Sequence, residues 1–184
     1  RMAIALRFPE TLSSEKDVLR EDEKKVLYKI LNEVIKDVEG YRKNEGSELA
    51  KDISLRVDLI ESYLQLAVKI DPERNSKIEE KLRSALLDLK QEVDSNRFEQ
   101  ELIFYLEKFD ITEEKVRLKN HLNYFREVME NDFPNGKKLG FISQEIGREI
   151  NTIGSKANHT ELKKIVVQMK DELEKIKEQL LNVL

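Results

Sequence analysis

Hydrophobic residues recur at steps of three and four over most of the chain, which is the spacing of one face of an α-helix. Between residues 21 and 69 the pattern hardly pauses, with one apolar series from Leu27 to Tyr41 and a second from Leu49 to Ala67. Gly40 and Gly46 each weaken a helix by about 1 kcal/mol relative to alanine. The pattern therefore predicts a long helix with a bend or a break near residues 44–46.

Pro72 marks the first expected turn. Proline cannot continue the hydrogen bonding of a helix, and Asp71 before it suits a helix N-cap. A second helix over residues 73–93, with its apolar series from Ile78 to Val93, should then fold back on the first. Two helices joined by so short a connection form an antiparallel hairpin.

Four more amphipathic segments follow, over residues 98–109, 112–131, 136–158 and 160–184, and Asn158-His159-Thr160 reads as the start of the last. This last segment keeps a strict heptad, typical of a coiled-coil seam, which can pack on its own chain or on another subunit. We predict an all-α fold: residues 1–20 as a linker or the remnant of an amino-terminal domain, residues 21–94 as a long antiparallel helical hairpin arm, and residues 95–184 as a compact helical carboxy-terminal domain that carries the candidate site.

Composition narrows the function classes. Charged residues make up 38% of the chain and the net charge is −4, so any nucleic-acid site must be a local positive patch on an acidic body. The absence of cysteine excludes disulfides and thiolate metal sites. No stretch approaches 18 consecutive apolar residues and no secretory signal is visible, so we expect a cytoplasmic protein without a membrane span.

A polar stripe runs beside the apolar seam of residues 136–158. Glu145 and Glu149 lie one helical turn apart, with Arg148, Thr152 and Lys156 at the same spacing. Two carboxylates beside a guanidinium and an amine can bind a metal or exchange protons. The alternative is a row of i,i+4 ion pairs on a solvated face, each contributing a few tenths of a kcal/mol.

Three other groups have both a structural and a chemical reading. The edge of the seam in residues 112–131 carries Glu114, Arg117, His121 and Tyr124. Half-burial at such an edge can shift the pKa of a side chain toward a catalytic role, although a lone histidine is commonly structural. Lys137 and Lys138 lie in the first turn of a predicted helix, where they could bind an anion such as phosphate. The alternative is that both lysines are simply exposed to solvent. Arg97 and Glu101 form a candidate ion pair.

These residues together resemble a known family, the YicC-like (YicC/YloC) endoribonucleases of bacteria, in their helical part. The resemblance runs from about Arg42 to the end of the chain, and the family's amino-terminal domain is absent. Gly140 and Gly147 stand where the family usually has Asp and Asn, and Leu184 stands where a terminal Glu is common. The matching positions are Arg42, Glu45, Gly46, Arg97, Glu101, Glu114, Arg117, Leu118, His121, Gly136, Lys137, Lys138, Leu139, Phe141, Gln144, Glu145, Arg148, Glu149, Asn151, Thr152, Ser155, Lys156, Ala157, Glu178, Gln179 and Asn182.

The resemblance implies a divalent-metal-dependent endoribonuclease that acts on single-stranded RNA in the cytoplasm as a ring-like homo-oligomer, a hexamer. It implies Mn²⁺ or Mg²⁺ on Glu145 and Glu149, with Glu114 as a third carboxylate. His121 would bind Mn²⁺ or serve as general acid or base, beside the catalytic carboxylates Glu114, Glu145 and Glu149. Phosphate binding would fall to Arg97, Arg117, Lys137, Lys138, Arg148 and Lys156, and base stacking to Tyr124.

Two other function classes fit the same residues. In a non-catalytic scaffold, the helices would assemble subunits and the polar stripes would be inter-subunit ion pairs. In an RNA-binding adaptor, Arg117, Arg148 and Lys156 would bind RNA that another nuclease cleaves.

Overall fold

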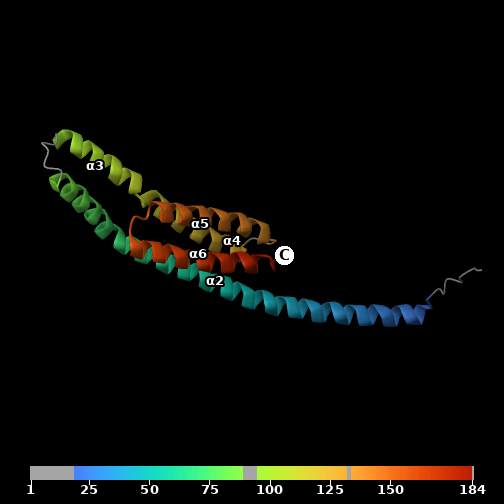
Figure 1. Ribbon diagram of the computed structural model, residues 1–184. Coiled ribbons are helices and arrows are strands. Elements are labelled where there is room, and N and C mark those ends of the chain that lie inside the picture. The colour runs from blue at the N-terminus through green and yellow to red at the C-terminus, as the bar shows by residue number, and fades with distance from the viewer. Residues whose placement is uncertain (1–18, 89–94, 132–133, 184) are drawn as a thin grey trace, which may run out of the picture. The chain divides into compact units, whose positions relative to one another are not determined.

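The computed structural model describes residues 19–88, 95–131 and 134–183, and within these ranges every regular element is an α-helix (Figure 1). The prediction of an all-α fold is confirmed. The interpretation of residues 1–20 as a linker falls almost wholly outside the described residues. None of the described helices has a stretch long and apolar enough to cross a membrane. The helices are α2 (Glu21–Asp88), α3 (Ser95–Phe109), α4 (Thr112–Asn131), α5 (Gly136–Lys156) and α6 (Thr160–Leu180).

The turn expected at Pro72 is wrong, because α2 continues through this residue. An interior proline costs a helix about 3 kcal/mol. Here buried side chains anchor the helix on both sides of it, with Ala67 and Asp71 before the proline and Arg74 and Ile78 after it. Tertiary packing therefore overrides the local preference. The chain reverses later, between α2 and α3, where the guanidinium carbon of Arg83 lies 5.6 Å from the ring centroid of Phe98.

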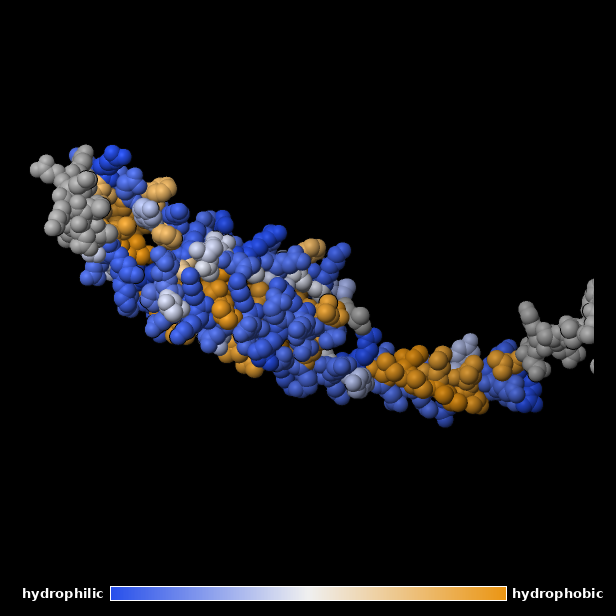
Figure 2. Space-filling model, in the orientation of Figure 1, coloured by the Kyte–Doolittle hydropathy of each residue, from blue (hydrophilic) through white to orange (hydrophobic). Residues whose placement is uncertain are grey.

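The break expected at residues 44–46 is also absent, since α2 stays helical through Gly40 and Gly46. The chain nevertheless divides between Glu45 and Gly46 into two compact units. In the first unit, the helical residues expose a series of large apolar side chains that Figure 2 shows as an orange band. These exposed residues are Val26, Leu27, Ile30, Leu31, Val34, Ile35 and Val38, and the exposed Tyr41 follows them on the same helix.

The second unit has one hydrophobic core, to which α2, α4, α5 and α6 all contribute. From α2 it takes Ile53, Val57, Ile60, Leu64 and Ala67. The heptad series of α6, from Leu162 through Met169 to Leu180, is buried in the same core. The seam of the last helix thus packs on its own chain, which decides the question that the heptad left open. Gly154 belongs to the same packing, because a Cβ added there would lie 2.9 Å from Cγ1 of Val166 on α6.

A half-buried ionic cluster joins α2 to α6. Glu172 accepts hydrogen bonds from Arg56 Nη1 at 3.0 Å and from Lys175 Nζ at 2.7 Å. Burial alone would raise the pKa of Glu172, but the hydrogen bonds from Lys175 and Arg56 outweigh it, so this pKa lies below its ordinary value of 4.5. The charged carboxylate therefore stabilises the folded chain.

This cluster predicts a pH-dependent stability. Above the ordinary pKa the contribution of Glu172 is fully present, and it is lost as the pH falls through the lowered pKa, because the unfolded chain takes up the proton first. We expect Glu172→Gln to be less stable than the wild type at neutral pH, and we expect this difference to shrink as the pH falls below 4.5 and through the lowered pKa. Urea unfolding of both proteins across this range measures the difference. A difference that did not change with pH would contradict the prediction.

Candidate functional site

The turn between α4 and α5 sets how these two helices meet. Asn135 is buried, and its Nδ2 donates to the carbonyl of Val128 at 3.2 Å, which ties the start of α5 to the end of α4. Gly136 opens α5 where a Cβ would lie 2.7 Å from the backbone oxygen of Val183. Only glycine fits such an approach without a shift of the backbone. The short turn and these contacts hold α4 and α5 as an antiparallel pair (Figure 1).

Two contacts fix the register of this pair. Near the start of α5, the Lys138 ammonium lies 5.3 Å from the ring centroid of Tyr124. Near its end, Lys156 Nζ lies 2.7 Å from Glu114 Oε1. In an antiparallel pair anchored in this way, His121 stands level with Glu145, and Arg117 with Glu149. We call this set the α4–α5 polar face: Glu114, Arg117, His121 and Tyr124 on α4, and Lys138, Glu145, Arg148, Glu149 and Lys156 on α5.

Two ion pairs on the polar face are exposed. Arg148 Nη1 donates to Glu145 Oε1 at 2.5 Å, and Arg117 pairs with Glu113 one turn before it. Exposed pairs of this kind contribute about 0–1 kcal/mol, so a phosphate group can displace either carboxylate at little cost. His121 lies half-buried beside them, and no hydrogen bond of its side chain is found among the described residues. The middle of the face thus offers two guanidinium groups and an imidazole.

Glu149 is the carboxylate of the polar face that has no counter-charge in the described part of the chain. Its side chain is on the buried edge of α5, with the residue 8% exposed, and the part of the chain that the structure describes supplies it with no hydrogen bond or ion pair. Its carboxylate oxygens nevertheless reach solvent, because they are not among the buried atoms that lack a hydrogen-bond partner. Carboxylate oxygens of this kind suit Mg²⁺ and Mn²⁺. The Glu145 and Glu149 pair therefore fits a divalent ion by its chemistry.

The expected third carboxylate is not grouped with that pair. Among the described residues, no three of the Asp, Glu and His side chains come together as a metal site. Glu114 is instead engaged by Lys156, which supplies its counter-charge on Oε1. Its buried Oε2 has no hydrogen-bond partner within the described ranges. A metal on Glu145 and Glu149 would thus need water, RNA phosphate or another chain for its remaining ligands.

A buried ionic network holds one end of the polar face. Arg74 is fully buried on α2, where its Nε donates to Asp71 Oδ1 at 2.9 Å and its Nη1 to the backbone carbonyl of Lys156 at 3.1 Å. Asp71 Oδ2 also accepts from Lys115 Nζ at 2.6 Å. Arg74 therefore caps the carboxyl end of α5 with a cation, which the helix dipole favours. Through these contacts α2 fixes where Lys156 meets Glu114.

Sequence reasoning missed Asp71, Arg74, Lys115 and Asn135. The signal for the first two was present, because Asp71 and Arg74 have the i,i+3 spacing of a helical ion pair. The interpretation of Pro72 as a turn concealed it. Asn135 had no signal beyond its place in a turn, since its partner Val128 is known only from the fold.

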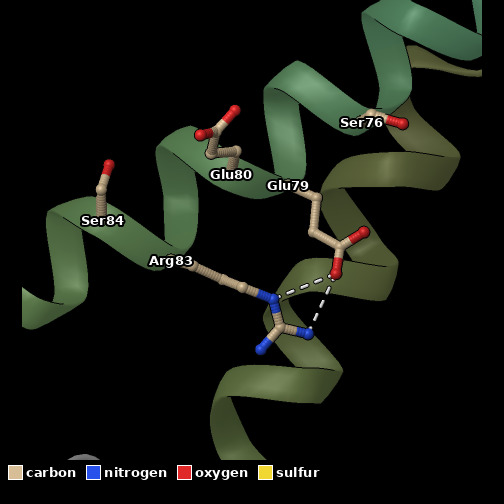
Figure 3. A pocket seen from close by; sticks show the side chains of 5 residues that line it. All are labelled: Ser76, Glu79, Glu80, Arg83 and Ser84. Carbon is tan, nitrogen blue, oxygen red and sulfur yellow. Dashed lines mark hydrogen bonds and ion pairs between the residues drawn. The ribbon is translucent and has the colours of Figure 1, made fainter.

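Other features lie apart from the polar face. Arg97 is on α3 and Lys137 is exposed on the first turn of α5. A shallow hollow on α2 is lined by Ser76, Glu79, Glu80, Arg83 and Ser84 (Figure 3). Arg83 Nε donates to Glu79 Oε1 at 3.0 Å across it. An exposed i,i+4 ion pair accounts for this arrangement, and none of the predicted site residues lines the hollow.

A family model and two named proteins that are similar to this chain all point to the same family. The family model described as "Endoribonuclease YicC-like, C-terminal" matches residues 67–184. A protein of Clostridioides difficile (strain 630), named probable endoribonuclease YicC, is 36% identical over 184 residues, which cover 96% of this chain and 62% of the relative. A protein of the same name from Haemophilus influenzae is 28% identical over 187 residues, covering 97% of this chain and 62% of the relative. The chain thus spans less than two thirds of the length of these relatives.

Proposed function

Because the chain belongs to the family of YicC-like endoribonucleases, we propose that it takes part in metal-dependent cleavage of phosphodiester bonds in single-stranded RNA. The observation that carries the proposal is the register of α4 and α5. It sets Arg117 and His121 of one helix level with Glu149 and Glu145 of the other. Phosphate-binding, proton-transferring and metal-binding groups then share one face.

Cleavage of a phosphodiester requires that the attacking oxygen lose a proton, that the leaving oxygen gain one, and that charge on the phosphate oxygens be neutralised. On the polar face, Arg117 and Arg148 would bind the phosphate, leaving their carboxylate partners Glu113 and Glu145. His121 would donate or accept the proton, since imidazole exchanges protons near neutral pH. Lys156 would bind a flanking phosphate while Glu114 holds its ammonium.

Glu145 and Glu149 would hold the divalent ion. Bound there, Mn²⁺ or Mg²⁺ would add positive charge at the phosphate oxygens and orient the substrate. Glu145 would be freed from Arg148, and Glu149 has no ion-pair partner among the described residues, so both carboxylates would be available to the ion. The exchange of Arg148 from carboxylate to phosphate links RNA binding to metal binding.

The homo-oligomer, as a hexamer, and the cytoplasmic location remain predictions from the family resemblance. An assembly would give the exposed apolar series of residues 26–41 a surface to pack on. It could also supply the ligands that one chain lacks around Glu145 and Glu149.

A cleavage assay tests the proposed function. We expect the full-length protein to make internal cuts in a labelled single-stranded RNA with Mn²⁺ or Mg²⁺. We expect none with EDTA, because the phosphate oxygens would then lack the positive charge that the ion supplies. Gel separation of the products at matched time points measures this. RNA binding without cleavage under any metal would favour the adaptor, and neither binding nor cleavage across several RNAs would favour the scaffold.

A further inference from the structure

Two aromatic side chains project from the α4–α5 pair without joining its core. Phe141 on α5 is 58% exposed and Tyr124 on α4 is 42% exposed. Phe141 follows Lys138 by one helical turn and precedes Glu145 by another, so it lies on the same stripe of α5 as these charged residues. Single exposed hydrophobic residues are common, but each of these two rings has charged residues beside it on the α4–α5 pair, which is a more specific arrangement.

The charges around the two rings favour an anionic ligand with flat apolar parts. The Lys138 ammonium lies 5.3 Å from the ring centroid of Tyr124, at the start of α5, where the helix dipole is positive. Arg148 lies two turns beyond Phe141 on the same stripe. Cations interleaved with exposed aromatic rings are the arrangement that binds the backbone and the bases of single-stranded nucleic acid.

We propose that Phe141 and Tyr124 form a stacking platform for unpaired nucleobases of single-stranded RNA, and that Lys138 binds the adjoining phosphate. The inference rests on the proposed function and adds a subsite to it. A base stacked on Phe141 would set the next phosphate one turn along α5, about 6 Å away, at Glu145 and His121. Every base has a flat face, so the platform accepts all four bases and rejects a duplex, whose bases are already stacked.

The platform explains how the polar face can select single strands. Arginine and lysine bind the phosphates of single and double strands alike, so the cations alone provide no such selection. Stacking on Phe141 requires a base that is free to leave its neighbours. The two aromatic residues thereby select single-stranded RNA, and the charged groups one turn away bind and cleave its backbone.

The test measures RNA affinity without cleavage, in EDTA, by fluorescence anisotropy with full-length protein. The probes are a labelled unstructured single-stranded RNA, the same RNA with abasic sites, and a duplex. We expect Phe141→Ala to weaken binding of the single strand about 5- to 150-fold, the range for loss of one stacked base. Phe141→Trp should keep the affinity, and Phe141→Leu should lose most of it because it retains apolar bulk without a flat ring.

Phe104→Ala is the matched control, because Phe104 on α3 has the same side chain at 59% exposure. It should bind RNA as the wild type does. Wild-type protein should also prefer the single strand over its abasic form, whereas Phe141→Ala should bind both equally. With metal present, Phe141→Ala should raise KM more than it lowers kcat, which a general loss of folding would not do.

Each contrary outcome overturns the platform in a recognisable way. If Phe141→Ala binds and cleaves RNA as the wild type does, stacking is wrong and the proposed function stands. If Phe141→Ala instead dissociates an oligomer in sedimentation, and its affinity falls only with that loss, Phe141 packs on a second copy. If the wild type neither binds nor cleaves RNA, the function and the platform fail together.

Discussion

Replacing Glu145 and Glu149 together by glutamine is expected to lower the rate of RNA cleavage by about 100-fold or more. Glutamine keeps the size of each side chain and removes the negative charge that would hold the divalent ion. Glu149 has no hydrogen bond or ion pair among the described residues, so the loss of its charge should not destabilise the fold. In the described part of the chain, Glu145 is held only by the exposed pair with Arg148.

The measurement is the single-turnover cleavage rate with Mn²⁺ and Mg²⁺, beside RNA affinity in EDTA and the oligomeric state. We expect cleavage to fall while affinity and assembly stay within about two-fold, since the removed charges repel RNA rather than bind it. Asp171→Asn/Glu174→Gln is the control, because it removes two exposed carboxylates from α6, one of them paired with Lys177 as Glu145 is with Arg148. Equal cleavage by the wild type and the Glu145/Glu149 variant would remove this pair from the mechanism.

Truncation of Asp71 to alanine is expected to lower the free energy of unfolding by about 3–5 kcal/mol. Arg74 is 0% exposed, and Asp71 is the carboxylate that compensates its charge. Without Asp71, the buried guanidinium would keep only the Lys156 carbonyl as acceptor and would lose its counter-charge, and the Lys115 ammonium would lose its carboxylate. Arg74→Met should cost less, because Asp71 would keep its 2.6 Å hydrogen bond from Lys115.

Urea unfolding followed by circular dichroism measures these differences. Glu79→Ala is the control: it breaks the exposed Arg83–Glu79 pair of the same helix, and we expect a loss of no more than about 1 kcal/mol. If Asp71→Ala and Glu79→Ala destabilised the protein alike, the network at the end of α5 would not be the anchor that its burial indicates.

The local pattern was sufficient to predict most of the helices and to identify the residues of the candidate site. The period of apolar residues identified the helices that became α4, α5 and α6, and His159 caps α6 where the start signal was read. The two polar stripes could be recognised in the sequence because Glu145, Arg148 and Glu149 recur at helical spacing, as do Glu114, Arg117 and His121. Hydrogen bonding inside a helix is local, and so is the spacing that puts residues on one face.

The same local reasoning failed at Pro72. The cost of an interior proline is a property of the helix, whereas the burial of Arg74 and its ion pair with Asp71 depend on α4 and α5 packing there. Residues far apart in the sequence supply that stabilisation, so the pattern around Pro72 gives no sign of it. The network that anchors Lys156 was hidden for the same reason.

By itself the sequence determined the helical class of this protein, the apolar seams and the residue types along each polar stripe. Only the tertiary structure decided which seams are covered: the series from Ile53 to Ala67 and the heptad of α6 are buried in one core, while the equally regular series from Leu27 to Tyr41 is exposed. It alone also brought Lys138 to Tyr124 and Lys156 to Glu114. Periodicity specifies a face of a helix, but the partner of that face follows from packing between distant segments of the chain.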